Sequence, residues 1–410
     1  MADRRSPARL LPALALLYLG QGLPMGLAFE ALPAQMRAQG FGTAQIGLVG
    51  LAILPWALRF LWAPLIDRWS GGHRARLLLP LQVALFATYL LAAVLPDSGG
   101  RGWASLGLVV FASLLAATQN TATDGLAVLA LPRERLGWAN GFQVGGFSLG
   151  MLLGGGLVLV VQGIAGWMAA WLLPALLVLI AMPLLRGLHR SVPPRRQEGR
   201  ARISLRAFLE RPRAAVMLSI AASFFFGRSF VGDLIGPALH DAGLDMAQIG
   251  VTRMAGTAAM AISATTLGAA CIARFGASRA GPAGGVAWAF ALLGWVALLR
   301  SGAMDPMLAT ALSVADGLAG GVTYAAFLTL FMRWASANQA GTDVTVLMST
   351  ETMSNIAAML LGGMTAGRLG LPATFELGAM LMLAAMLWAF LTAPPIDRPA
   401  DSKEARHAHP

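Results

Sequence analysis

Ionisable side chains interrupt several apolar stretches of this sequence. They include the carboxylic acids Glu30, Asp124, Asp233 and Glu351. A charged group inside a bilayer is costly, so it usually faces a water-filled cavity or a partner of opposite charge. Because burial favours the neutral form of a carboxyl group, such an acid can hold and release a proton. We therefore treat these four acids as candidate proton carriers.

A second set of residues could bind a ligand. Arg59 and Arg228 offer fixed positive charge, which suits an anionic group. Glu351 and Asn355 are four residues apart, so they share a helical face. The candidate ligand-binding set is Arg59, Arg228, Gln119, Asn120, Phe226, Phe230 and Asn355. A structural role stays open for each member, because ion pairs also hold membrane helices together and aromatic rings also pack against lipid.

The sequence gives no sign of enzymatic or metal chemistry. Its five histidines fall in connectors or in the C-terminal tail, and Cys271 is the one cysteine. This distribution provides no cluster with the spacing of metal ligands. No Gly-x-Ser-x-Gly turn or phosphate-binding glycine loop stands in a suitable setting. We expect no enzyme, no metal and no cofactor.

Composition indicates a membrane protein. Of the 410 residues, 57% are hydrophobic and 12% are charged, and the mean hydropathy is +0.67. The apolar residues come in blocks of about twenty, which is the length that crosses a ~30 Å hydrocarbon core. The net charge of +11 lies in short connectors and not along one helical face, so it does not indicate a nucleic-acid partner.

The apolar blocks predict an all-α integral membrane protein with twelve transmembrane helices. Their approximate positions are 9–29, 44–66, 76–95, 104–131, 137–162, 166–186, 214–236, 246–272, 280–299, 306–332, 342–366 and 371–393. The first block follows three arginines but lacks a small-residue cleavage site. We expect it to be retained as a span and not removed as a signal peptide.

The distribution of Lys and Arg predicts the orientation. Alternate connectors hold most of these residues, including nine between Arg186 and Arg213, and the opposite connectors hold Arg37, Arg101, Arg300 and Arg368. Basic connectors stay in the cytoplasm. Both termini are therefore predicted to be cytoplasmic.

A short repeat divides the chain into two halves. Residues 40–47 read GFGTAQIG and residues 243–250 read GLDMAQIG, and each follows a Pro-Ala pair. Parallel repeats around a central cavity are a common plan of secondary transporters. We expect a six-helix half at 1–186, a basic cytoplasmic linker at 187–213, a second pseudo-symmetric half at 214–393 and a tail at 394–410. The linker is interpreted as a solvated loop and not as a binding site.

The connector after the second predicted span carries a motif. Residues 63–76 read APLIDRWSGGHRAR, with an Asp-Arg pair at the end of the span. This resembles the signature loop of the major facilitator superfamily. A carboxylate there can pair with an arginine or cap a helix in one conformation only. Asp67 and Arg68 are therefore candidates for a gate, with an ordinary basic connector as the alternative.

A narrower resemblance covers roughly the first 185 residues. Residues 59–68 (RFLWAPLIDR), 18–24 (YLGQGLP) and 117–125 (ATQNTATDG) look like the AmpG-like branch, which includes muropeptide permeases and acetyl-CoA transporters. Residues 28–33 (AFEALP) and 54–59 (LPWALR) look most like the RhtX/FptX siderophore importers. Asn120 departs from the branch, which often has Asp there.

The resemblance implies a function and a location. It implies a monomeric transporter of the bacterial inner membrane that imports a siderophore or ferric siderophore, with the proton gradient as its energy source. Import of a muropeptide, or of another amphipathic solute, is the alternative within the same fold. A membrane sensor or scaffold without transport is the alternative outside it.

Overall fold

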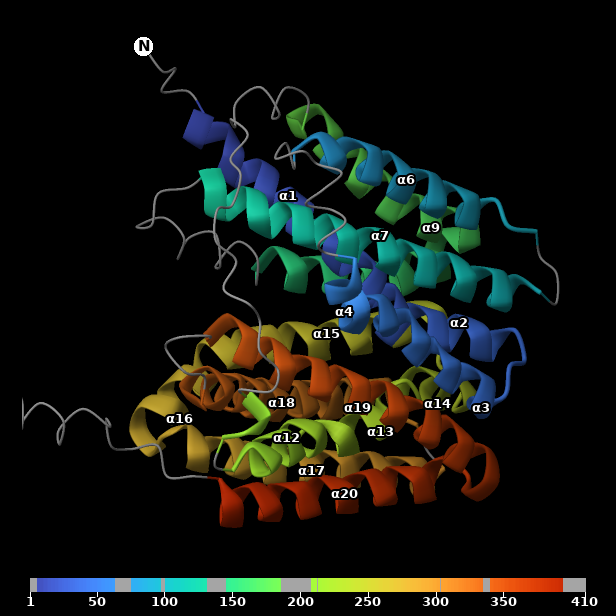
Figure 1. Ribbon diagram of the computed structural model, residues 1–410. Helices are drawn as coiled ribbons and strands as arrows, with labels where there is room; N and C mark the ends of the chain where they lie inside the picture. Colours follow the sequence, from blue (N-terminus) through green and yellow to red (C-terminus); the bar gives the residue numbers. More distant parts are fainter. Residues whose placement is uncertain are drawn as a thin grey trace, which may run out of the picture.

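The structure is a computed structural model that describes residues 6–62, 75–96, 100–130, 145–185, 208–211, 213–302, 304–334 and 340–393. Within these ranges the regular structure is helical. Figure 1 shows two groups of helices, one formed by α1 to α9 and the other by α12 to α20. The core between and within the groups is apolar, as a bundle of amphipathic and apolar helices requires.

The first group holds the N-terminal elements. They are α1 (Ser6–Gly26), η1 (Leu27–Ala31), α2 (Leu32–Ala38), α3 (Thr43–Ile46), η2 (Gly47–Ile53), α4 (Leu54–Leu58), η3 (Arg59–Leu61), α6 (Ala75–Ala93), α7 (Arg101–Ala130), η5 (Leu153–Leu157) and α9 (Val158–Leu185). The elements η1 and η5 are π-helical, and η2 and η3 are 3-10 helices.

The second group holds the C-terminal elements. They are α12 (Ala214–Ser223), α13 (Phe226–Gly232), α14 (Ile235–Asp241), α15 (Met246–Thr265), α16 (Leu267–Phe275), α17 (Ala277–Ser301), α18 (Pro306–Trp334), α19 (Ala340–Leu369) and α20 (Leu371–Thr392).

Ten described segments are long and apolar enough to cross a membrane. One of them, Gly145–Leu185, has 41 residues and is broken at Gly166, where φ is 80°. It covers the predicted fifth and sixth spans. The predicted second span is the shorter apolar helix Thr43–Leu58. The described residues thus contain ten long apolar segments where twelve spans were expected. The shorter helix Thr43–Leu58 accounts for one further predicted span, and the part of Gly145–Leu185 after Gly166 accounts for the other.

The first span is longer than predicted. Its helix continues through η1 and α2 to Ala38, where the apolar pattern suggested an end near residue 29. Pro33 does not stop it, because it lies in the first turn of α2, where a missing N–H is tolerated. Glu30 consequently lies inside the span and not at its end.

The repeated octapeptides form equivalent turns in the two groups. Gly40 and Gly243 have φ of 86° and 92°, a conformation that favours glycine. The following helix starts in the same way in both groups. The Gln45 side chain accepts a hydrogen bond from the Gly42 N–H at 2.9 Å, and the Gln248 side chain accepts one from the Asp245 N–H at 3.1 Å.

Glycines bring the two groups into close contact. A Cβ atom added at Gly250 of α15 would lie 2.5 Å from the carbonyl oxygen of Gly156 in η5. A Cβ atom added at Gly363 of α19 would lie 2.6 Å from the carbonyl oxygen of Thr43 and 2.9 Å from Cα of Gly47. The repeat relates Gly47 to Gly250, so the two crossings are pseudo-symmetric. Small residues permit such close approach of helix backbones.

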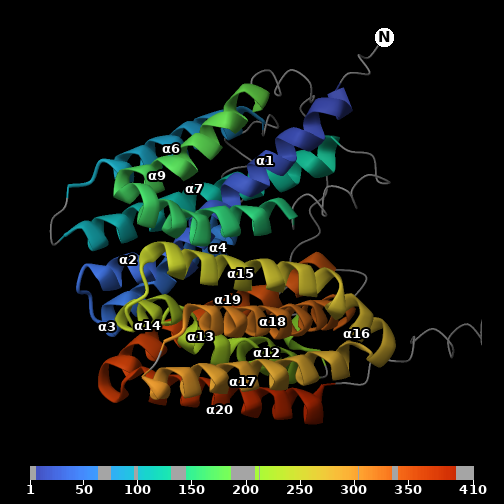
Figure 2. The ribbon, with the colours of Figure 1, turned by 180° about the vertical axis from the view of Figure 1, so that it is seen from behind.

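One end of the molecule joins the groups most closely. There α2 of the first group lies beside α14 of the second and α3 lies beside α19, and the helices of the two groups diverge towards the end at which α1 begins (Figures 1 and 2). We call the end formed by α2, α3, α14 and the junction of α19 with α20 the Arg37 end. The orientation predicted from the basic connectors places it outside the cytoplasm.

Candidate functional site

A hydrogen-bonded network of α1, η3 and α7 occupies the first group. Gln21 donates to the Thr123 hydroxyl at 3.1 Å, and Asn120 donates to the Gln21 side-chain oxygen at 3.0 Å. Arg59 donates from Nη1 to the Asn120 Oδ1 at 2.5 Å, and its guanidinium lies 5.8 Å from the centre of the Trp56 ring. Arg59 and Asn120, predicted separately, thus belong to one network. Gln21 and Thr123 were missing from the predicted set.

Gln119 lies next to this network along α7. Its side chain is fully buried, and neither its amide nitrogen nor its amide oxygen has a hydrogen-bond partner within the described part of the chain. A buried amide with a free donor and a free acceptor can bind a hydroxyl or another amide. Gln119 therefore stays a candidate for binding a neutral polar group.

Arg228 of α13 is paired within the second group. Its Nη2 lies 3.1 Å from the Asp316 Oδ2 of α18, and its Nε donates to the same oxygen at 3.2 Å. Trp288 of α17 donates to the other carboxylate oxygen at 2.9 Å, and its ring centre lies 5.8 Å from the guanidinium carbon. The predicted ligand-binding arginine is thus held by a partner on a neighbouring helix.

We expect the substitution R228Q to destabilise the fold. Both members of the pair are at most 12% exposed, and removal of Arg228 takes away the charge that bonds the Asp316 carboxylate directly. Such a loss costs about 3–5 kcal/mol. Denaturant unfolding of the purified protein in detergent should show this loss, and the double variant R228Q/D316N should recover part of it. Wild-type stability of R228Q would show that the pair does not hold these helices together.

On α19, the predicted pair of Glu351 and Asn355 is present. Asn355 donates to Glu351 Oε1 at 2.8 Å, and both side chains are buried. The ring centres of Phe226 and Phe230 lie 6.3 Å apart, and Phe230 is 7% exposed. Phe224 stacks on Phe327 in the core, so packing accounts for that ring. Whether Phe226 and Phe230 contact a ligand remains a prediction.

Glu30 reaches across from the first group to the second. It accepts a hydrogen bond from the hydroxyl of Thr257, and its Oε1 lies 3.9 Å from Arg253 Nη2. Both partners belong to α15. Asp233, just after α13, is 3% exposed, and both of its carboxylate oxygens lack a partner among the described residues. Arg253 was missing from the predicted set, although its charge within a predicted span was the signal that marked Arg228.

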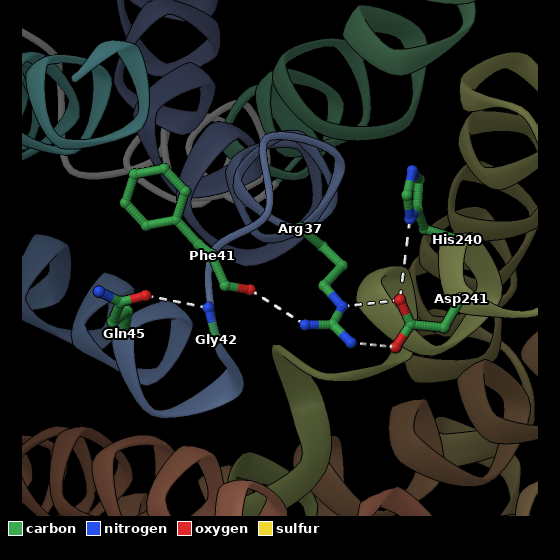
Figure 3. Close-up of polar contacts among 6 residues, drawn as sticks. All are labelled: Arg37, Phe41, Gly42, Gln45, His240 and Asp241. Atoms are coloured by element: carbon green, nitrogen blue, oxygen red, sulfur yellow. Dashed lines mark hydrogen bonds and ion pairs between the residues drawn. The ribbon is translucent and has the colours of Figure 1, made fainter. Parts of the chain in front are cut away.

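Arg37 and Asp241 join the two groups at the Arg37 end (Figure 3). Arg37 Nε lies 2.6 Å from Asp241 Oδ1 and Nη2 lies 2.7 Å from Oδ2, which is a two-pronged contact. Arg37 also donates to the Phe41 carbonyl at 3.1 Å, and His240 Nδ1 lies 3.8 Å from Asp241 Oδ1. The contact therefore closes this end of the molecule with a bond between α2 and α14.

We expect the substitution D241N to open the Arg37 end only modestly. Arg37 and Asp241 are 29% and 33% exposed, and a partly exposed pair contributes about 0.2–1 kcal/mol, which changes the ratio of open to closed molecules by at most about fivefold. Spin labels at Ala38 and Ala242, with Cys271 replaced, would measure the distance across this end. The exchange variant R37D/D241R should restore closure. A wider distance in the exchange variant than in D241N would contradict a role for this ion pair.

Some predicted residues lie beyond what the structure describes. The candidate gate residues Asp67 and Arg68 are outside the described ranges, as are the tail and most of the linker. Asp124 lies in α7, but its side chain is outside the described part.

Comparison with known proteins identifies the family. The family model described as Major Facilitator Superfamily matches residues 14–269, which is more than half of the chain. The anhydromuropeptide permease of Escherichia coli K12 is 30% identical over 248 residues, which cover 58% of this chain and 50% of that protein. The match thus spans about half of the permease. An uncharacterized protein of Haemophilus influenzae is 24% identical over 398 residues, covering 91% of this chain and 92% of its own.

Solved structures share the fold. A bacterial homologue of the human lysosomal transporter Spinster, in an inward-facing and occupied conformation, has a TM-score of 0.73 at 16% identity and covers 95% of this chain and 97% of its own. A D-xylose-proton symporter has a TM-score of 0.71 at 12% identity, with 96% and 99% covered. With the family model and the two groups of membrane helices, these matches lead to one conclusion: the chain belongs to the Major Facilitator Superfamily and is a multi-pass membrane protein.

Proposed function

We propose that this transporter imports a cell-wall fragment of the muropeptide type by alternating access. The observation that carries this proposal is the 30% identity to the anhydromuropeptide permease over 248 residues. The proposal includes a monomer in the bacterial inner membrane, with both termini in the cytoplasm. It replaces the siderophore as the first choice of solute.

The polar residues of the first group suit such a solute. A sugar-peptide presents hydroxyl and amide groups, which pair with neutral donors and acceptors. Gln21, Asn120 and Thr123 bring such groups together in one network, where they bond one another, and Gln119 beside them has a donor and an acceptor without a partner among the described residues. Apolar cavities with a few convergent polar groups are the usual binding sites for small molecules.

The buried acids support coupling to protons. Glu30, Asp233 and Glu351 are each at most 5% exposed in helices that cross the membrane. Neutral carboxyl groups are better tolerated there than carboxylates, so these residues can exchange protons with the two sides in turn. The proposed energy source is the proton gradient, and Asp124 is included on its sequence position alone.

Uptake by intact cells would test the function. Cells with and without the gene would receive a radiolabelled anhydromuropeptide, with and without a protonophore. We expect uptake that requires the gene and collapses with the protonophore. Equal uptake in both strains would refute the muropeptide proposal.

A second arm with a radiolabelled ferric siderophore tests the solute that was expected first from the sequence. None of the relatives described above is named for a siderophore, so we expect the same uptake with and without the gene. Gene-dependent uptake of iron would return the siderophore to first place.

A further inference from the structure

Two buried arginines of the second group differ in how well they are bonded. Arg228 makes a hydrogen bond and an ion pair with Asp316 at 3.2 and 3.1 Å. Arg253 of α15 is only 7% exposed, yet its Nε has no hydrogen-bond partner within the described residues. A guanidinium has five donors, and leaving them unbonded in a buried place is costly. Arg253 Nε is thus available to donate a hydrogen bond, whereas Arg228 Nε already donates to Asp316.

The carboxylate nearest to Arg253 does not use this capacity. Glu30 Oε1 lies 3.9 Å from Arg253 Nη2, which is too long for a hydrogen bond, and it accepts from Thr257 instead. Glu30 Oε2 is buried and has no partner within the described residues. Glu30 therefore balances the charge of Arg253 without accepting a hydrogen bond from its guanidinium.

The backbone around Glu30 has an unusual form. Glu30 belongs to the π-helical turn η1, and the second π-helical turn, η5, packs against it. A Cβ atom added at Gly155 of η5 would lie 2.5 Å from Glu30 Oε2 and 3.0 Å from Glu30 Cβ, so Gly155 leaves the space that the Glu30 side chain occupies. Single π-helical turns are frequent at functional sites. Glu30 lies in one π-helical turn and packs against a second, which is the arrangement expected of a functional site.

We propose that Arg253 binds a carboxylate of the transported solute, and that Glu30 occupies the place of this carboxylate in the empty protein and gives it up by taking a proton. The proposal rests on the function proposed above and adds the chemical class of the group that is recognised. An arginine presents a planar fork that matches a carboxylate with two parallel hydrogen bonds.

The charges around Arg253 explain why a proton is needed. Arg253 interacts electrostatically with Glu30, Asp233, Asp316 and Arg228. Asp316 balances the charge of Arg228, and an ionised Glu30 balances the charge of Arg253. A solute carboxylate would add a further negative charge in a medium of low dielectric constant. Protonation of Glu30 removes one charge and frees Arg253 at the same time.

Calorimetric titration of the full chain in lipid nanodiscs would test the proposal. The probes are an anhydromuropeptide with free carboxylates and the same compound with its carboxylates amidated. We expect R253Q to weaken binding of the free form about 30-fold and to bind the amidated form as the wild type does. R253K should lie between, because an ammonium lacks the fork. The matched control is R274Q, at an exposed arginine of α16.

Glu30 gives a second readout. Wild-type affinity for the free form should rise as the pH falls, whereas E30Q should bind it with little dependence on pH. The proposal is overturned when R253Q keeps both the wild-type affinity and the preference for the free form. If R253Q does not fold, the same comparison on R253K decides, and an unchanged preference overturns the proposal.

Failure of the function proposed above would be recognised separately. If the wild type binds neither form, the muropeptide assignment fails and the probes become acetate, succinate and inorganic phosphate. Thermal stabilisation that saturates in the wild type and is absent in R253Q would support an anion site at Arg253. The same shift in both proteins, or no shift in the wild type, would rule it out.

Discussion

The substitution E30Q is expected to abolish uphill accumulation of the solute while leaving exchange of solute for solute intact. Glutamine keeps the oxygen that accepts from Thr257 and cannot take up a proton. A pH step of one unit is worth about 1.4 kcal/mol per proton, so a one-to-one symporter accumulates its solute about tenfold. Proteoliposomes with an imposed pH step would show this accumulation for the wild type and none for E30Q.

The matched control is the partly exposed acid Glu376, whose Oε1 lies 2.6 Å from Nη2 of the exposed Arg300. The substitution E376Q should leave both accumulation and exchange at the wild-type level. Proton-driven accumulation by E30Q would remove Glu30 from the coupling mechanism. Loss of exchange as well as accumulation would instead indicate that Glu30 is needed for solute binding or for the structural change itself.

The substitution G250A is expected to hold the Arg37 end open and to slow transport. The added Cβ would lie 2.5 Å from the Gly156 carbonyl oxygen and 2.6 Å from the Val160 backbone nitrogen, and backbone atoms cannot move aside as a flexible side chain can. Overpacking of this kind costs about 1–3 kcal/mol, so the population of the closed form relative to the open form should fall by about 5- to 160-fold. The distance between labels at Ala38 and Ala242 and the uptake rate would both report it.

Gly107 provides the control for this experiment. It lies in α7, and a Cβ atom added there meets nothing within 4 Å. The substitution G107A should therefore leave the distance between the two spin labels and the uptake rate of the solute unchanged. G47A, at the pseudo-symmetric crossing, should repeat the effect of G250A, since its Cβ would lie 2.8 Å from the Met359 carbonyl oxygen. An unchanged label distance in both variants would show that these crossings do not control closure.

Several features of the fold follow from the sequence alone. Blocks of about twenty apolar residues must be helical in a bilayer, because only internal hydrogen bonds satisfy the backbone there. The octapeptides at 40–47 and 243–250 predicted two related halves, and the structure shows why they are alike: each needs a glycine with positive φ and a glutamine that caps the next helix. The i,i+4 pair of Glu351 and Asn355 also needed only the helical period.

The limits of the sequence appear at the first span. The apolar pattern ended it near residue 29, because Glu30 interrupts the apolar block. The structure carries the helix to Ala38, so Glu30 comes to lie inside the membrane-spanning segment. Local patterns do not report a π-helical turn or a glycine on another helix, and both surround this acid in the structure.

The sequence by itself determined which residues are charged within apolar helices, and with them the family and the kind of chemistry to expect. The tertiary structure decided which of these charges are paired. Arg228 and Arg253 look alike in the sequence. Arg228 is hydrogen-bonded to Asp316, which lies 88 residues along the chain. Arg253 lies 3.9 Å from Glu30, which is more than 220 residues away and makes no hydrogen bond to it. Pairing depends on distances across packed helices, and these distances arise only when the two halves meet.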